Sequence, residues 1–186
     1  MANLESADKQ NIWITGASSG IGKAIVQQLA AQGHQIYISG RNLEVLDKLA
    51  AQDGNITPIP CDVGNDEAMQ ILLQNHDIEY LDTVILCAGT CEYIDLPLLD
   101  IQKTRRVLDS NFFGVVNSCI AALPLLKKTN AITGKKPYIL GIGSMSSYLG
   151  FPRAEAYGSS KAAMSYFLNS LRSDLNDVID ITMVYP

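Results

Sequence analysis

Two residues late in the chain, Tyr157 and Lys161, have the types and the spacing that proton transfer requires. They stand four positions apart in Tyr-Gly-Ser-Ser-Lys, and a helix places residues at this spacing on one face, about one turn apart. A free tyrosine has a pKa of about 10, which is too high for a base near neutral pH. A neighbouring positive charge lowers that pKa. The pair alone is a weak signal, because an exposed helix face produces the same pattern.

Short apolar runs alternate with helical patterns along the chain that must position this pair. Strands are expected at 11–15, 35–39, 56–60, 83–86, 138–142 and 179–185. Helices are expected from the first glycine cluster to Gly33 and at 43–50, 66–74, 101–128 and 154–176. Pro124 is expected to bend or restart the long helix at 101–128. The polar stretch 127–137 is predicted to be a surface loop.

This alternation predicts an α/β fold, a three-layer, doubly wound parallel β-sheet with helices on both faces. In such sheets ligands bind beyond the carboxyl ends of the strands, at the point where the strand order reverses. The residues that directly follow each strand are therefore the candidate ligand contacts. Ser144 is one of them, since it follows the strand expected at 138–142.

A glycine loop follows the first strand, with glycines at positions 16, 20 and 22. Glycines permit a tight turn and a close approach of the backbone to a phosphate. The helix that follows offers unpaired N–H groups and the positive end of its dipole. Glycines also serve helix–strand packing, so the preceding strand and the following helix raise this signal only to moderate strength.

Arg41 follows the second strand, where an NAD site would place an acidic residue for the ribose hydroxyls. A guanidinium there can pair instead with a 2′-phosphate. The sequence therefore favours NADP(H) over NAD(H), the alternative being a solvated loop arginine. Asp62 follows the third strand and is interpreted equally well as an acceptor for the adenine amino group or as a helix cap, and Val63 as packing on the adenine ring.

The composition narrows the functional class. The 186 residues are 47% apolar and carry a net charge of −5, and the absence of a basic run argues against nucleic-acid binding. No signal-peptide core and no apolar stretch long enough for a bilayer is found, so a cytoplasmic protein without membrane contact is expected. The four cysteines are interpreted as buried free thiols in a reducing compartment, the two histidines as surface residues, and no metal site is expected.

In this order, the motifs closely resemble those of the short-chain dehydrogenase/reductase family. They stand as Thr15-Gly-Ala-Ser-Ser-Gly-Ile-Gly22, Asp62-Val63, Cys87-Ala-Gly89, Asn111, Ser144, Tyr157-x-x-x-Lys161 and Tyr185-Pro186. The resemblance covers essentially the whole chain and implies a single Rossmann-type dinucleotide-binding domain over 1–186.

The resemblance also implies a role for each matching residue. Tyr157 would be the general acid/base for a carbonyl or secondary alcohol, and Lys161 would lower its pKa and hold the nicotinamide ribose. Ser144 would stabilise the substrate oxygen, and Asn111 would hold a water that links Lys161 to solvent. The cofactor-binding residues implied are Thr15, Gly16, Ser18, Ser19, Gly20, Ile21, Gly22, Arg41, Asp62, Val63, Cys87, Ala88, Gly89, Tyr157, Lys161 and Pro186.

Two departures from the family pattern matter. Position 87 is cysteine where the family usually has asparagine, which removes an amide near the cofactor ribose. Family chains also continue past the proline at 186, so a substrate-covering loop and a last strand are expected beyond it. Cys91, Met145, Ser146, Tyr148 and Phe151 are expected to line the visible part of a mixed, moderately apolar substrate pocket.

The leading hypothesis is therefore an NADP-dependent oxidoreductase acting on a small-molecule carbonyl or alcohol. The alternative is a non-catalytic NADP(H)-binding regulatory or scaffolding protein on the same fold, and a nucleotide-sugar epimerase or dehydratase ranks lower. A serine hydrolase is rejected because Ser144 is not in G-x-S-x-G. The apolar circumference of the helices expected at 101–128 and 154–176 indicates a homodimer or homotetramer, or else helix contacts within one chain.

Overall fold

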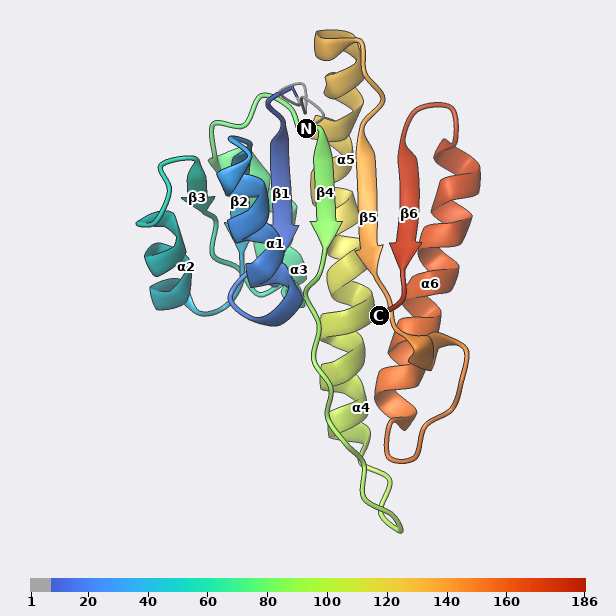
Figure 1. The fold of residues 1–186 in the computed structure, drawn as a ribbon. Coiled ribbons are helices and arrows are strands. Elements are labelled where there is room, and N and C mark those ends of the chain that lie inside the picture. Colours follow the sequence, from blue (N-terminus) through green and yellow to red (C-terminus); the bar gives the residue numbers. More distant parts are fainter. Residues whose placement is uncertain (1–7) are drawn as a thin grey trace, which may run out of the picture.

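The computed structural model of the chain describes residues 8–186, and six strands alternate with helices over that range (Figure 1). The strands are β1 Asn11–Thr15, β2 Gln35–Ser39, β3 Ile56–Pro58, β4 Thr83–Leu86, β5 Tyr138–Ile142 and β6 Asp180–Val184. The α-helices are α1 Gly20–Ala31, α2 Leu43–Ala50, α3 Asp66–Leu72, α4 Ile101–Leu108, α5 Gly114–Thr133 and α6 Glu155–Leu175. Three short turns of helix complete the set, the 3-10 turns η1 Leu73–Asn75 and η3 Met145–Ser147 and the π-helical turn η2 Asp109–Phe113.

All six strands are parallel and lie in the order β3-β2-β1-β4-β5-β6. The chain moves outward from β1 to β3, then returns to the other side of β1 with β4. The order therefore reverses between β1 and β4, and a ligand site is expected beyond their carboxyl ends. This arrangement confirms the predicted doubly wound parallel sheet.

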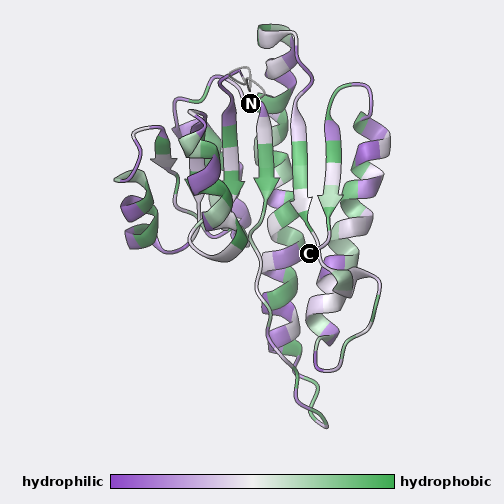
Figure 2. Ribbon diagram, viewed as in Figure 1, coloured by the Kyte–Doolittle hydropathy of each residue, from purple (hydrophilic) through white to green (hydrophobic). Residues whose placement is uncertain are grey.

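Helices cover both faces of the sheet, and each face has its own apolar core. On one face α3, α5 and α6 pack on a core that includes Trp13, Leu86 and Met164. On the other face α1 and α2 pack on a second core, which includes Ile14 and Val26. The strands are apolar along most of their length, as buried parallel strands are (Figure 2).

The long helical segment from Ile101 to Thr133 differs from the prediction in two respects. Its irregularity is the π-helical turn η2 around Asn111, whereas α5 runs through Pro124. The segment also continues past Lys128 to Thr133, so the loop predicted at 127–137 is mostly helical. The helix ends at Gly134, whose left-handed backbone (φ +70°) is the usual glycine termination.

The same segment also meets a length and composition criterion for a membrane-spanning helix. It has 33 residues. An 18-residue stretch within it has a mean hydropathy of 1.2, and 39% of that stretch is buried inside the fold. The prediction that no stretch was long and apolar enough is therefore wrong by this criterion. Core helices of water-soluble proteins pass the same test, so the criterion assigns no membrane segment here.

Two predictions about single residue types are also corrected. His34 is buried rather than at the surface, and its Nδ1 accepts a hydrogen bond of 3.2 Å from the Gln10 N–H. Among the four free cysteines only Cys119 is fully buried, and Cys91 is exposed. Burial raises the pKa of Cys119 to about 12, which makes it an inert core residue, whereas Cys91 faces the site described next.

Candidate active site

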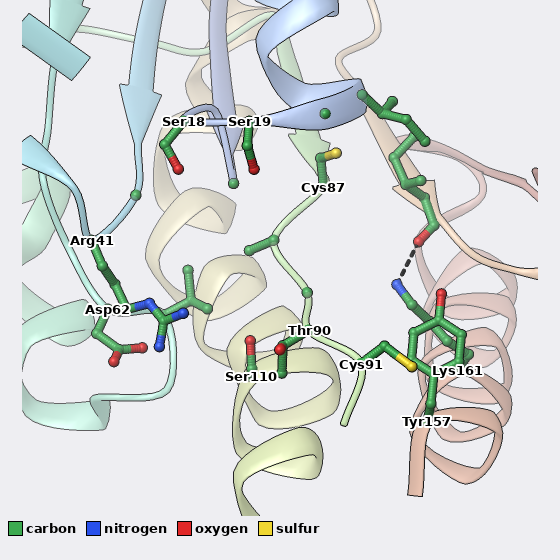
Figure 3. Close-up of a pocket in the computed structure, with 18 of the residues that line it drawn as sticks. Ser18, Ser19, Arg41, Asp62, Cys87, Thr90, Cys91, Ser110, Tyr157 and Lys161 are labelled. Carbon is green, nitrogen blue, oxygen red and sulfur yellow. Dashed lines mark hydrogen bonds between the residues drawn. The ribbon is translucent and has the colours of Figure 1, made fainter. Parts of the chain in front are cut away.

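A cavity of about 490 Å³ lies beyond the carboxyl ends of the strands, where the sheet order reverses (Figure 3). Arg41 and Asp62 stand at one end of the view, and Tyr157 and Lys161 at the other. The residues that line it come from the loops after β1 to β6, the start of α1, the end of β5, and from η2 and α6. They are Gly16, Ser18, Ser19, Gly20, Ile21, Gly40, Arg41, Cys61, Asp62, Val63, Cys87, Ala88, Gly89, Thr90, Cys91, Ser110, Ile142, Gly143, Tyr157, Lys161 and Pro186.

The glycine loop is shaped by two close backbone contacts. Gly16 has φ +70°, and a Cβ there would lie 2.6 Å from the Cα of Ala88. A Cβ at Gly22 would lie 2.3 Å from the carbonyl oxygen of Gly16. Neither position accepts a side chain, so the loop turns tightly and directs the amino end of α1 toward the cavity.

Arg41 and Asp62 form the end of the cavity beyond β2 and β3, and both are exposed. The Asp62 Oδ1 accepts a hydrogen bond of 3.0 Å from the Gly64 N–H. The cap of α3 is Asn65, whose Oδ1 accepts from the Ala68 N–H at 3.0 Å. The interpretation of Asp62 as a helix cap is therefore wrong. Val63 is buried against Gly114 and also lines the cavity.

Thr15 connects β1 to the loop after β4. Its hydroxyl oxygen accepts hydrogen bonds of 3.2 Å from the backbone N–H groups of Cys87 and Ala88. Thr15 is buried and does not line the cavity. Its contribution is thus to hold the edge of the cavity at Cys87 and Ala88 against the glycine loop.

Tyr157 and Lys161 lie in the first two turns of α6, and both reach the cavity. The Lys161 Nζ lies 6.0 Å from the centroid of the Tyr157 ring. It donates a hydrogen bond of 2.8 Å to the carbonyl oxygen of Ile142 at the end of β5. The predicted helical juxtaposition is therefore present, with the ammonium tied to the sheet.

Lys161 is a buried cation, with only 5% of its surface exposed. Burial lowers the pKa of Lys161, an effect that the nearby Cys87 partly opposes. For the Cys87 thiol, burial has the opposite effect and raises the pKa, while the charge of Lys161 and the backbone amide of Gly22 lower it. Within residues 8–186 no carboxylate forms an ion pair with Lys161. A buried cation without such a partner is costly for the fold, and such groups gather at functional sites.

Ser144 follows β5 and caps the short turn η3, its Oγ accepting from the Ser146 N–H at 3.2 Å. It is half-buried and follows Gly143, which lines the cavity. Because the Ser144 oxygen is the acceptor in this bond, its hydroxyl proton can be donated to a ligand.

Asn111 is fully buried in the π-helical turn η2. Its Oδ1 accepts from the Thr90 N–H at 2.7 Å, and its Nδ2 donates to the Thr90 carbonyl at 2.8 Å. Nδ2 also donates to the Ser160 Oγ at 2.9 Å, and Ser160 donates to the Tyr157 carbonyl at 2.7 Å. These three hydrogen bonds satisfy the buried amide and connect the loop after β4 to α6.

The structure brings most of the predicted site residues to one cavity, and four of them are not among the residues that line it. Those four are Thr15, Gly22, Asn111 and Ser144. Thr90 and Ser110 line the cavity but were missed, although both adjoin motifs that the sequence displays. Of the predicted substrate-pocket residues, Cys91 lines this cavity, whereas Ser146, Tyr148 and Phe151 line a separate hollow of about 400 Å³ beside η3 and α6.

The cavity fits a dinucleotide: glycines where a Cβ would collide, a helix amino end, an arginine at one end and a Tyr–Lys pair at the other. The fold and the cavity define a dinucleotide-binding α/β protein. A family model, described as short chain dehydrogenase, matches residues 10–186. The chain belongs to this family.

Curated relatives agree with this assignment. An uncharacterized oxidoreductase of Myxococcus xanthus is 31% identical over 180 residues, which cover 93% of this chain and 69% of that protein. The 11-beta-hydroxysteroid dehydrogenase 1A of Arabidopsis thaliana is 32% identical, with 94% of this chain and 51% of that protein covered. The 3-ketodihydrosphingosine reductase of Bacteroides thetaiotaomicron is 32% identical, with 95% of this chain and 63% of that protein covered. The chain thus spans about half to two thirds of these relatives.

Solved structures resemble the fold over nearly the whole chain. Serine dehydrogenase from Escherichia coli superposes with a TM-score of 0.87 at 26% identity, covering 95% of this chain and 82% of that one. The RhlG/NADP active-site complex of Pseudomonas aeruginosa superposes with a TM-score of 0.86 at 27% identity, covering 97% of this chain and 73% of that one. The fold of this chain therefore matches that of both solved structures.

Proposed function

We propose that this chain is the catalytic part of an oxidoreductase that interconverts a carbonyl and a secondary alcohol with NADP(H), with Tyr157 as general acid/base. The observation that carries the proposal is the single cavity that joins the glycine loop and Arg41 to the Tyr157–Lys161 pair. When bound, a nicotinamide dinucleotide would supply or accept the hydride. We take residues 8–186 as one dinucleotide-binding unit, and the cytoplasmic location stays a prediction.

The residues at each end of the cavity have distinct tasks in this proposal. The backbone of the loop at 16–22 and the amino end of α1 bind the pyrophosphate. Arg41 pairs with a 2′-phosphate, and no acidic side chain directly follows β2 to favour an unmodified ribose. Lys161 and the backbone at Gly89 hold the sugar near Tyr157.

Proton transfer in this proposal uses the hydroxyl groups of Ser144 and Tyr157 and the ammonium of Lys161. In reduction, the Tyr157 hydroxyl gives its proton to the carbonyl oxygen while the carbonyl carbon gains a hydride, so an alcohol forms and tyrosinate remains. The Lys161 ammonium stabilises that tyrosinate, which then regains a proton from solvent. Ser144 keeps its proton and donates a hydrogen bond from its hydroxyl to the same substrate oxygen, which stabilises the charge that develops there.

The substrate proposed is a ketone or alcohol on an apolar skeleton. The names of two relatives refer to a hydroxysteroid and to ketodihydrosphingosine, both largely apolar. Large apolar side chains are also exposed near the Tyr157 end of the fold, on the loops before α4 and α6. They include Leu96, Leu98, Leu99, Tyr148, Leu149 and Phe151.

The test is an assay of the full-length protein with NADPH and NADH against a panel of ketones and aldehydes that includes steroid and long-chain ketones. We expect oxidation of NADPH, with a lower kcat/KM for NADH. Oxidation of neither cofactor with any carbonyl would favour the alternative of a non-catalytic dinucleotide-binding protein. Equal or better use of NADH would contradict the role given to Arg41.

A further inference from the structure

Arg153, in the turn that leads into α6, has an unusual backbone conformation. Its φ is +67°, and among residues 8–186 it is the one residue other than glycine in the left-handed region. A side chain with a Cβ pays a free-energy cost there that glycine avoids. Since a glycine would fit this turn with less strain, the arginine side chain is expected to have a use of its own.

The arginine reaches across to three consecutive residues of the loop between β4 and α4. Its Nε donates a hydrogen bond of 2.8 Å to the Asp95 Oδ1. Its guanidinium carbon lies 4.9 Å from the centroid of the Tyr93 ring, a cation–π distance. Its carbonyl oxygen accepts from the Ile94 N–H at 3.0 Å. We call this set of contacts the Arg153 clasp.

The clasp places an apolar side chain directly beside the proposed acid/base. Ile94 is buried in a small cluster with Val107 of α4 and Ala156 of α6. Tyr157, the third residue of α6, packs against the same cluster. A displacement of Ile94 would therefore disturb the cluster against which Tyr157 packs.

The same loop also forms part of the cavity. Thr90 and Cys91, a few residues before Ile94, line it, and Figure 3 draws the Cys91 side chain beside Tyr157. Contacts with α4 hold the loop from below, since Arg106 makes two hydrogen bonds to the Glu92 carboxylate at 3.0 and 2.6 Å. The clasp adds the connection to the turn before α6, so it joins this loop to the helix that carries Tyr157.

We propose that Arg153 is a positioning residue for the reaction: through the clasp it fixes the distance between Tyr157 and the loop at 90–95. The proposal rests on the proposed function of Tyr157. An exposed ion pair adds little to stability, and Arg153 and Asp95 are both largely exposed. The effect of the clasp is therefore expected in turnover more than in stability.

The experiment compares the full-length protein with Arg153→Gly, Arg153→Lys and, as a matched control, Arg105→Ala on the exposed side of α4. Glycine relieves the backbone strain while removing the guanidinium, so the Tm is expected to change by no more than about 4 °C. We expect kcat to fall about ten- to a hundred-fold with the Kd for NADPH unchanged, because small misplacements of a reacting group cost rates of this order. Arg153→Lys keeps the charge without the planar guanidinium, so its kcat should lie between those of the wild type and Arg153→Gly. The control Arg105→Ala should have the kcat of the wild type.

Wild-type kcat and KM in Arg153→Gly would overturn the proposal even if Tyr157→Phe is inactive. If the wild type turns over no carbonyl, the proposed function fails, and amide hydrogen exchange then decides about the clasp. The two reporters are the N–H of Ile94, bonded to Arg153, and the N–H of Gly158, which donates to the Ala154 carbonyl at 2.7 Å. We expect faster exchange at both in Arg153→Gly, and unchanged exchange would overturn the clasp.

Discussion

Asn111 binds both backbone groups of Thr90, accepting from its N–H at 2.7 Å and donating to its carbonyl oxygen at 2.8 Å. Beyond the end of β4 these backbone groups have no neighbouring strand to pair with, and the buried amide of Asn111 binds them instead. Through Ser160 the same side chain reaches the carbonyl of Tyr157. The loop after β4 and the first turn of α6 are thus held by one residue of the π-helical turn.

Replacing Asn111 by alanine should therefore destabilise the fold as well as the site. The variant leaves the part-buried N–H and carbonyl of Thr90 without their protein partner, and a fully buried unpaired group costs about 1–3 kcal/mol. We expect a loss of about 2–4 kcal/mol in the free energy of unfolding, measured by urea denaturation. Asn117→Ala, a control on α5 whose amide binds Val63 and the exposed Asp66, should cost less, and equal losses would contradict this reading.

The buried charge of Lys161 should lower the free energy of unfolding, although the proposed reaction needs that charge. Burial lowers its pKa in the folded state below the unfolded value of about 10.4. Between these two values the unfolded chain binds the proton more tightly, so stability should rise as pH rises through that window. Below its folded pKa the protein bears the whole cost of the buried charge.

Lys161→Met removes that charge at similar size. We expect an unchanged or higher Tm at pH 7, loss of the rise in stability below pH 10.4, and a fall in kcat of about a hundred-fold or more. Thermal unfolding from pH 7 to 10 together with steady-state kinetics measures both effects. A clearly lower Tm with normal kcat would show that Lys161 is structural.

The outer side of α6 should take part in self-association. Tyr166 is 79% exposed there, and Ile120 on α5 and Phe113 in η2 are also exposed. Phe112 and Phe167 meet edge-on at 6.2 Å and connect these elements. Tyr166→Glu in the full-length protein should shift a dimer or tetramer toward monomer in sedimentation velocity, while Ile71→Glu, on the exposed side of α3, should not. An unchanged assembly in the first variant would place the interface elsewhere.

The sequence predicted the framework of the site well, for a physical reason. Strands buried on both faces must be apolar, so the bounds of β1, β2, β4 and β5 match the expected ranges. A Cβ at Gly16 or Gly22 would collide with the neighbouring backbone. The spacing of these glycines in the sequence therefore predicts the loop directly. The Tyr157–Lys161 spacing works likewise, because helix periodicity alone brings the two side chains to one face.

What the sequence could not predict depends on contacts between distant segments. The π-helical turn forms where Asn111 binds Thr90 and Ser160, which no local pattern encodes. The Arg153 clasp joins residues far apart in the chain. The end of α5 was a different case, since Gly134 signalled it but the polarity of the preceding residues suggested a loop. There Thr133 stabilises the last turn by donating to the Thr129 carbonyl at 2.8 Å.

The measurement that tests the central proposal most directly is the comparison of wild type and Tyr157→Phe in the full-length protein. NADPH binding is followed by fluorescence titration, and NADPH oxidation with the best ketone of the panel by absorbance. We expect the variant to bind NADPH with an unchanged Kd and to lose at least about a hundred-fold in kcat, as removal of a general acid/base does. Wild-type turnover by Tyr157→Phe would contradict the assignment of Tyr157 as the proton donor.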